Sequence, residues 1–288
     1  MLLRAKDIYK RAITLRPNNT IFDARNVLVK HNISRIIIAR SNDTPSGIVT
    51  EKDIVRYLYA HADTESLDNI PLEKIMTENL ITVSGQKSIQ ECALLMLAHK
   101  ISSLIVTNSD NTLLGIFTKS DLTEMYARSG IDKVRVNEYM AKDVITASPN
   151  ELLYSILLSM NSKGISRIVV TLNDEPIGIV TVQDLVYMNM LFGLRGLINL
   201  QASKGSSSSL LSDRKRINLP SNIRRLLIVR DVMKYDPITI DSDSYLFRAA
   251  QIMINNRISG IPVVNSIDNL VGIITKTDII KRLGSIEY

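Results

Sequence analysis

The chain has 288 residues, of which 45% are hydrophobic and 22% are charged, the balance of a soluble globular protein. No apolar run reaches the roughly 18–20 residues that cross a bilayer, and the charged N-terminal segment differs from the apolar core of a signal peptide. Cys92 is the only cysteine, which excludes an intramolecular disulfide and a cysteine-based metal site, so we expect a cytoplasmic protein. The net charge of +6 suits a phosphate-rich partner or simply a solvated surface.

Two short sequence elements recur four times along the chain. The first is Ile-Ser followed by apolar residues, at 33–38, 101–106, 165–170 and 258–263. The second follows at a nearly constant distance and reads Gly-apolar-apolar-Thr-x-x-Asp-apolar, at 47–54, 115–122, 178–185 and 272–279. Two elements in register, four times over, indicate internal structural repeats.

The order of elements within a repeat is clearest in the second copy. Residues 80–83 form a short extended run, and 89–99 carry apolar residues at helical spacing, with Ser88 as N-cap and Glu91 three residues later. Residues 104–106 and 113–118 read as strands around a polar turn at 108–111, and Asp121 is expected to open a last helix to residue 126. Each repeat is therefore strand-helix-strand-strand-helix.

The apolar strands indicate burial on both faces, and a repeat of about 55 residues is a marginal core alone. We therefore predict an α/β (α+β) protein in which repeats one and two form one pseudo-twofold module and repeats three and four another. The motif glycines lie 68, 63 and 94 residues apart, so the second module contains an insertion.

The insertion, residues 189–228, combines a Ser/Gly-rich run with a cluster of cations. The cations in and just after it are Arg214, Lys215, Arg216, Arg224, Arg225 and Arg230. One interpretation is a contact with nucleic acid or an acidic protein. The preferred one is a flexible, solvated loop, because no aromatic residues interleave with the charges to stack on bases.

The shared motif has chemistry suited to a nucleotide. Its glycine precedes a strand and would let the backbone turn and a ligand approach closely. Its threonine lies beside the N-terminus of a helix, where unpaired N–H groups favour a phosphate, and its aspartate can accept two hydrogen bonds from a ribose diol. The alternative is structural, because Thr-x-x-Asp at this junction can equally be a helix cap.

On both elements, the chain resembles the CBS (cystathionine-beta-synthase) domain family. The resemblance covers residues 5–58, 72–127, 136–188 and 229–283. With four such repeats, the chain is similar to stand-alone four-repeat proteins and to the gamma subunit of AMP-activated protein kinase. It implies a regulatory, non-catalytic sensor that binds AMP, ADP or ATP between paired repeats, called Bateman modules. S-adenosylmethionine is a competing ligand that would not use phosphate-binding cations. The sequence does not decide whether the protein is a monomer or a homodimer, or which protein effector it regulates.

The resemblance also assigns site residues. The motif aspartate would bind ribose and the motif threonine phosphate, in the pairs Thr50/Asp53, Thr118/Asp121, Thr181/Asp184 and Thr275/Asp278. Arg35 would reach across to the Thr118/Asp121 site and Arg167 to the Thr275/Asp278 site, while Lys52 would contact phosphate from the partner side. The cleft with Asp121, Thr118, Arg35 and Lys52 is the first choice. No metal cluster, catalytic triad or phosphate loop is evident, so no enzyme activity is expected.

Overall fold

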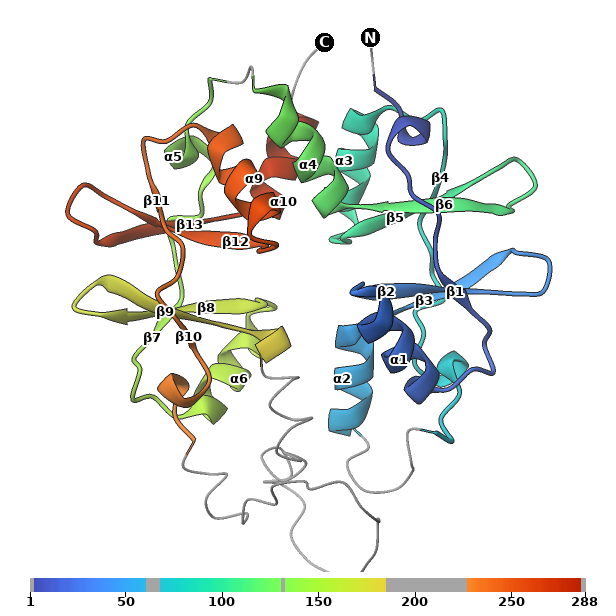
Figure 1. Cartoon of the computed structure of the whole chain (residues 1–288), viewed down its shortest axis with the longest axis horizontal. Coiled ribbons are helices and arrows are strands. Elements are labelled where there is room, and N and C mark those ends of the chain that lie inside the picture. The colour runs from blue at the N-terminus through green and yellow to red at the C-terminus, as the bar shows by residue number, and fades with distance from the viewer. Residues whose placement is uncertain (1–2, 61–67, 131–132, 185–226, 286–288) are drawn as a thin grey trace, which may run out of the picture.

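The computed structural model describes residues 3–60, 68–130, 133–184 and 227–285. Figure 1 shows four units arranged around a centre, with repeats 1 and 2 (blue to green) on one side and repeats 3 and 4 (yellow-green to red) on the other. The 189–228 insertion lies almost wholly outside the described residues. None of the described helices has the length and apolarity that a membrane span requires.

The first module contains repeats 1 and 2. Repeat 1 comprises β1 (Thr14–Leu15), α1 (Ile21–His31), β2 (Arg35–Ala39), β3 (Pro45–Thr50) and α2 (Glu51–Ala60). Repeat 2 comprises β4 (Thr82–Ser84), α3 (Ile89–Ala98), β5 (Ser103–Thr107), β6 (Leu113–Thr118) and α4 (Lys119–Ser129). In each repeat the first strand is parallel to the second, and the second forms an antiparallel hairpin with the third.

The second module repeats this plan. Repeat 3 comprises α5 (Val136–Tyr139), β7 (Thr146–Ala147), α6 (Leu153–Ser162), β8 (Arg167–Leu172) and β9 (Glu175–Thr181). Repeat 4 comprises β10 (Lys234–Tyr235), β11 (Ile240–Asp241), α9 (Leu246–Asn255), β12 (Gly260–Val264), β13 (Leu270–Thr275) and α10 (Lys276–Gly284). Short 3-10 turns at Ala5–Asp7, Leu72–Lys74 and Val229–Asp231 precede repeats 1, 2 and 4. The predicted α/β class is confirmed, and repeats 1, 2 and 4 show the predicted element order in full, whereas the last helix of repeat 3 is described only over residues 182–184.

Local sequence explains where the helices begin. Ser88 caps α3 and exchanges hydrogen bonds with Glu91, as predicted, and Thr20 does the same with Asp23 before α1. The last helix of repeat 2 differs from the expectation, because α4 begins at Lys119 rather than at Asp121. Thr118 is its N-cap and Asp121 its third residue, so the motif spans the cap and the first turn.

The opening segment of each repeat, ahead of its parallel strand pair, lies on the sheet of the partner repeat; we call these the crossing segments. The Ala5 N–H donates to the Lys87 carbonyl at 2.8 Å, and the later part of the same segment bridges β6. In the same way, the crossing segment of repeat 2 pairs with β3 through Thr77. Those of repeats 3 and 4 pair with β13 and β9 through Ala141 and Lys234. This reciprocal exchange ties two marginal cores into one module.

The exchange also explains the motif glycines, whose role was predicted wrongly. Gly115 lies within β6, and an added Cβ would be 2.5 Å from the Lys10 carbonyl oxygen of the crossing segment. At Gly272 an added Cβ would meet the sulfur of Met140 at 2.5 Å. Each glycine therefore admits the crossing segment, and neither adopts the left-handed backbone of a turn.

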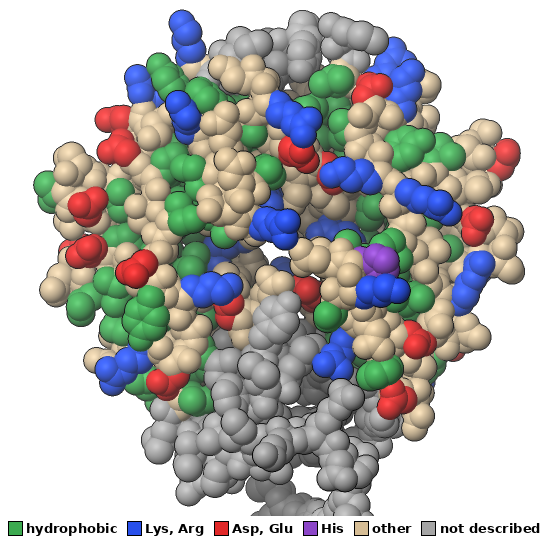
Figure 2. Space-filling view, viewed as in Figure 1, with side chains coloured by type: hydrophobic (Ala, Val, Ile, Leu, Met, Phe, Trp, Pro, Cys, Tyr) green, Lys and Arg blue, Asp and Glu red, His purple; other side chains and the backbone are tan. Residues whose placement is uncertain are grey.

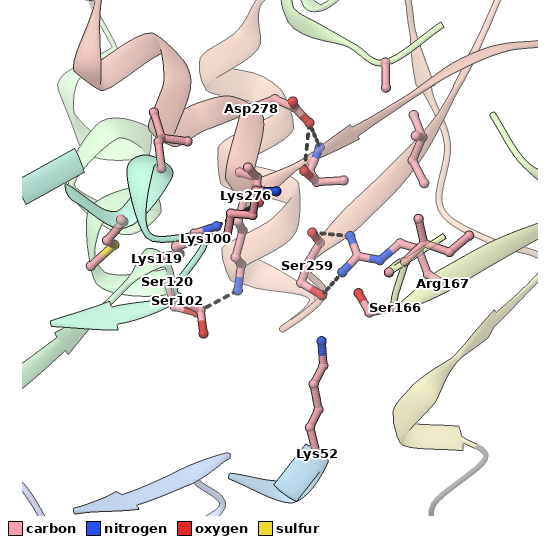
Figure 3. A pocket seen from close by; sticks show the side chains of 18 of the residues that line it. Lys52, Lys100, Ser102, Lys119, Ser120, Ser166, Arg167, Ser259, Lys276 and Asp278 are labelled. Atoms are coloured by element: carbon pink, nitrogen blue, oxygen red, sulfur yellow. Dashed lines mark hydrogen bonds between the residues drawn. The ribbon is translucent and has the colours of Figure 1, made fainter. Parts of the chain in front are cut away.

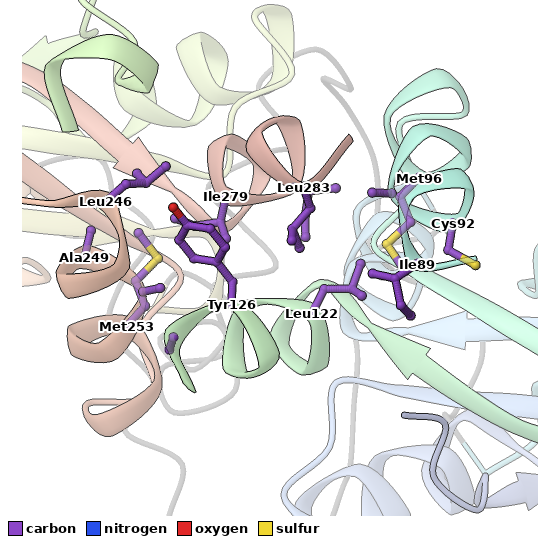
Figure 4. Close-up of a cluster of buried hydrophobic side chains, with 14 of the residues drawn as sticks. Ile89, Cys92, Met96, Leu122, Tyr126, Leu246, Ala249, Met253, Ile279 and Leu283 are labelled. Atoms are coloured by element: carbon purple, nitrogen blue, oxygen red, sulfur yellow. The ribbon is translucent and has the colours of Figure 1, made fainter. Parts of the chain in front are cut away.

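The two modules meet through the helices of repeats 2 and 4. Helices α3, α4, α9 and α10 pack together, and their buried side chains form one continuous core. Tyr126 of α4 points between Met253 of α9 and Ile279 of α10 (Figure 4). Repeats 1 and 3 have separate, smaller clusters.

Candidate functional site

All four motif aspartates hydrogen-bond back to the motif threonine in the same capping geometry, with the aspartate three residues after the threonine. One carboxylate oxygen accepts from both the N–H and the hydroxyl of the motif threonine. The hydroxyl distances to that oxygen are 2.6 Å for Thr50/Asp53, 2.7 Å for Thr118/Asp121, 2.5 Å for Thr181/Asp184 and 2.7 Å for Thr275/Asp278. The threonine hydroxyl is thus engaged by the aspartate, and the other carboxylate oxygen, Oδ1, is the one left to meet a ligand.

The Oδ1 atoms contact two different kinds of cation. Asp53 and Asp278 are paired with cations of their own helices. Asp53 is paired with Arg56, and Asp278 is paired with Lys281 at a distance of 2.7 Å. Asp121 and Asp184 are instead paired with lysines of the crossing segments. The Nζ atom of Lys10 lies 2.6 Å from Asp121, and that of Lys234 lies 2.7 Å from Asp184. Sequence reasoning missed both lysines.

The two arginines reach across their modules in the predicted directions. Arg35 of repeat 1 donates from Nη1 to the Ser102 hydroxyl at 3.1 Å, and Arg167 of repeat 3 donates from Nη2 to the Ser259 hydroxyl at 2.7 Å. Arg167 lies directly over Gly260, where a side chain would collide with its guanidinium. Burial lowers the pKa of both arginines, and the charges of Asp121 and Asp278 oppose this effect. Arginine nevertheless stays charged.

A cavity of about 760 Å³ lies at the centre, where all four repeats meet. Figure 2 shows Lys and Arg side chains around this hollow. Among the described lining residues two are acidic, Asp143 and Asp278, and six are basic: Arg35, Lys52, Lys100, Lys119, Arg167 and Lys276. Lys52 extends from the start of α2 toward Ser259 (Figure 3). Such an excess of positive charge in a hollow favours an anion.

Lys119 and Lys276 form a reciprocal pair between the modules. Lys119, the first residue of α4, donates to the Thr277 hydroxyl at 3.0 Å, and Lys276, the first residue of α10, donates to the Ser120 hydroxyl at 2.9 Å. Neither has a carboxylate in salt-bridge contact within the described residues. Burial, and then nearby cations, lower the pKa of both lysines, while an aspartate of the facing repeat opposes the shift.

Replacing Lys119 with methionine is expected to stabilise the ligand-free protein by about 1 kcal/mol, because it removes a poorly compensated charge from a helix N-terminus. The folded-state pKa of Lys119 lies below its ordinary value of 10.5, so the unfolded chain binds more protons between these values. Stability should therefore rise as pH increases toward 10.5, and the variant should lose this part of the rise. Urea unfolding at several pH values measures both effects. Lys100→Met, at an exposed cavity position, is the matched control, and equal behaviour of the two variants would contradict the assignment.

The four clefts are not equivalent. The cavity includes Thr275 and Asp278, and its lining also contains the apolar residues Ala141, Val144, Ile145, Ile165 and Ile273. In repeat 2 it reaches Thr118 but not Asp121. The Asp278 cleft thus combines an arginine, an aspartate without a crossing lysine, and access to the central cations. This ranking differs from the sequence-based first choice, the Asp121 cleft with Thr118, Arg35 and Lys52.

The other predicted residues are placed as follows. Thr50 and Asp53 face a cleft in which Ser103 takes the place of the arginine, and Thr181 and Asp184 face one in which Gly260 does. Lys52 and Arg35 both line the central cavity. Among the described residues no group of His, Cys, Asp or Glu could hold a metal ion.

Comparison with known proteins agrees with this architecture. The CBS domain model matches residues 5–60, 72–128, 136–188 and 229–285. The uncharacterized protein MJ1225 of Methanocaldococcus jannaschii is 27% identical over 290 residues, which cover 94% of this chain and 95% of that protein.

Solved structures extend the comparison. The structure of MJ1225, described there as a proposed archaeal homologue of g-AMPK, superposes with a TM-score of 0.78 at 24% identity, covering 97% of this chain and 99% of that one. An uncharacterized conserved protein from Pyrococcus horikoshii gives a TM-score of 0.67 at 18% identity, covering 98% and 100%. A homoserine O-acetyltransferase of Methanococcus vannielii matches only in part, at 31% identity over 42% of this chain and 25% of that enzyme.

Proposed function

The chain belongs to the CBS-domain family, and we propose that it is a non-catalytic sensor of adenine nucleotides whose principal site is the Asp278 cleft. The observation that carries this proposal is the continuity between a cleft with apolar walls, a carboxylate at a helix entrance and a cationic cavity. Adenine, ribose and phosphate need these three environments in this order. AMP, ADP and ATP are the candidate ligands.

The nucleoside part has a fitting environment. The apolar side chains of Val144, Ile145 and Ile165 form a slot for the base. The ribose diol would donate to Asp278 Oδ1 in place of Lys281, whose ammonium group now lies 2.7 Å away. Asp278 is only 4% exposed, so a hydrogen bond formed there would be well shielded from water.

The phosphate groups of the nucleotide would have several possible partners. The N-terminus of α10 offers N–H groups and a positive dipole. Arg167 and Lys276 flank it, with Lys119 and Lys52 further into the cavity. These cations favour a phosphorylated ligand over S-adenosylmethionine, which shares the adenosine but has no phosphate to neutralise them.

A regulatory output can follow from the double role of α10. Its first turn carries Lys276 and Asp278, and its later residues Ile279, Ile280 and Leu283 are buried in the core shared by the modules. A ligand that shifts α10 would therefore change how the modules pack. It can do so only by binding one arrangement more tightly than another.

Isothermal titration with AMP, ATP and S-adenosylmethionine tests this function. Asp278→Asn should weaken AMP binding by about 10–100-fold, because it removes a charged acceptor while the asparagine side-chain oxygen can still accept from the Thr275 N–H. Asp184→Asn is the matched control, because Asp184 has the same cap but no arginine in its cleft, and it should leave AMP binding unchanged. Absence of AMP and ATP binding to the unaltered protein would refute the proposal.

A further inference from the structure

The crossing segments carry one equivalent position in each of the four clefts. This position forms a backbone bridge to the residue just after the motif glycine. The four bridges are Lys10 to Ile116, Thr77 to Ile48, Ala141 to Ile273 and Lys234 to Ile179. The shared register makes these four residues directly comparable, and their side chains fall into two classes.

The two lysines reach the ribose-binding carboxylate of their cleft. Lys10 extends from its bridge on β6 to Asp121 at the start of α4, where Nζ lies 2.6 Å from Oδ1. Lys234 extends from β10 to Asp184, where the distance is 2.7 Å. Each lysine stem therefore runs from the sheet to the helix entrance, across the path a nucleoside would take. Thr77 and Ala141 are too short to do so.

The carboxylates on which these lysines lie are well shielded. Only 12% of the Asp121 side chain and 10% of the Asp184 side chain are exposed. The Asp53 and Asp278 side chains, 7% and 5% exposed, are shielded as well and are paired with Arg56 and Lys281, so a ribose would have to displace a cation in every cleft. Only in the Asp121 and Asp184 clefts would it also have to move a lysine stem of the crossing segment. The central cavity reaches Asp278 and includes none of Asp53, Asp121 and Asp184.

We propose that Lys10 and Lys234 are built-in ligand substitutes that close two of the four clefts to ribose, so that each module keeps a single cleft free of a crossing lysine. This inference rests on the proposed nucleotide-binding function and determines which clefts can fill. The Asp278 cleft has Arg167 and would hold the phosphorylated ligand. The Asp53 cleft has Ser103 in place of the arginine and would bind a nucleotide more weakly.

The two closed clefts differ in what their opening would produce. The Asp121 cleft already contains Arg35, so removal of Lys10 should complete a second site for a nucleotide phosphate. The Asp184 cleft has Gly260 where an arginine would be needed, so removal of Lys234 should add only weak binding. The two lysines therefore give a matched pair of substitutions.

The test is the number of AMP molecules bound per chain, measured by isothermal titration on the full-length protein. Lys10→Thr installs the residue found at the open position 77 and should add one site within about tenfold of the affinity of the first. Lys234→Thr should add no site of that strength. Arg11→Thr, a change of the neighbouring exposed cation, should leave the number of sites unchanged.

The double variant Lys10→Thr/Asp121→Asn identifies the new site, because it should lose the added site and keep the original one. If the unaltered protein binds AMP and Lys10→Thr adds no site, the inference is overturned while the proposed function stands. If Asp121→Asn alone removes a site, Lys10 does not close that cleft and the inference also fails. If no variant and no parent binds AMP or ATP, the proposed function itself fails.

Discussion

Replacing Tyr126 with alanine is expected to lower the free energy of unfolding by about 3–5 kcal/mol, the loss typical of truncating a buried aromatic residue. Tyr126 is 2% exposed and lies in the core that repeats 2 and 4 share, beside Met253 and Ile279. The truncation leaves a cavity between the modules rather than within one repeat. Urea unfolding followed by circular dichroism measures the loss.

Two further results locate the effect at the module interface. Tyr126→Phe keeps the ring and should cost no more than about 1 kcal/mol, the usual size of one hydrogen-bond contribution. Because α10 carries Asp278 as well as part of this core, Tyr126→Ala should also weaken AMP binding. A loss of stability below about 1 kcal/mol for Tyr126→Ala would show that the two repeats do not depend on one core.

Local sequence was sufficient to predict the elements of each repeat. The hairpin strands are short apolar runs separated by polar turns, and Ser88 with Glu91 forms a cap whose geometry depends on neighbouring residues alone. The start of α4 was predicted two residues late, because an aspartate in a Thr-x-x-Asp motif reads equally well as the cap or as its partner three residues on. Only the backbone conformation distinguishes these.

The exchange of crossing segments could not be predicted in the same way. Lys10 belongs to repeat 1 by sequence but lies on the sheet of repeat 2, and nothing in the pattern of its neighbours indicates this. The role of the motif glycines depended on the exchange, since the chain that approaches Gly115 is the segment containing Lys10. Long-range packing of this kind leaves no local periodicity to detect.

The candidate site was predictable to the extent that its residues sit in the repeated elements. The family resemblance predicts toward which partner repeat Arg35 and Arg167 extend, and each donates to a serine of that repeat, while their role in binding phosphate stays a prediction. The ranking of clefts was not predictable, because it depends on Lys10 and Lys234. The sequence signal for this difference lies in the residues that follow Tyr9, Met76, Met140 and Met233 in the crossing segments, which are Lys10, Thr77, Ala141 and Lys234.

Replacing Arg167 with methionine is expected to weaken AMP binding by about 10–100-fold, because a charge-assisted hydrogen bond to phosphate is lost. Methionine keeps the apolar stem that packs beside Gly260. Adenosine, which has no phosphate, should bind the variant and the unaltered protein equally. Isothermal titration with both ligands separates the phosphate contribution from any change in the apolar slot.

Arg35→Met supplies the comparison that distinguishes the clefts. Both arginines are half-buried, contact a serine of the partner repeat and line the same cavity, so a general loss of positive charge would affect AMP equally in both variants. A cleft-specific role instead predicts that Arg35→Met changes AMP binding little in the unaltered chain and strongly after Lys10→Thr. Equal losses for Arg35→Met and Arg167→Met in the unaltered chain would mean that the central cavity, rather than the Asp278 cleft, determines phosphate affinity.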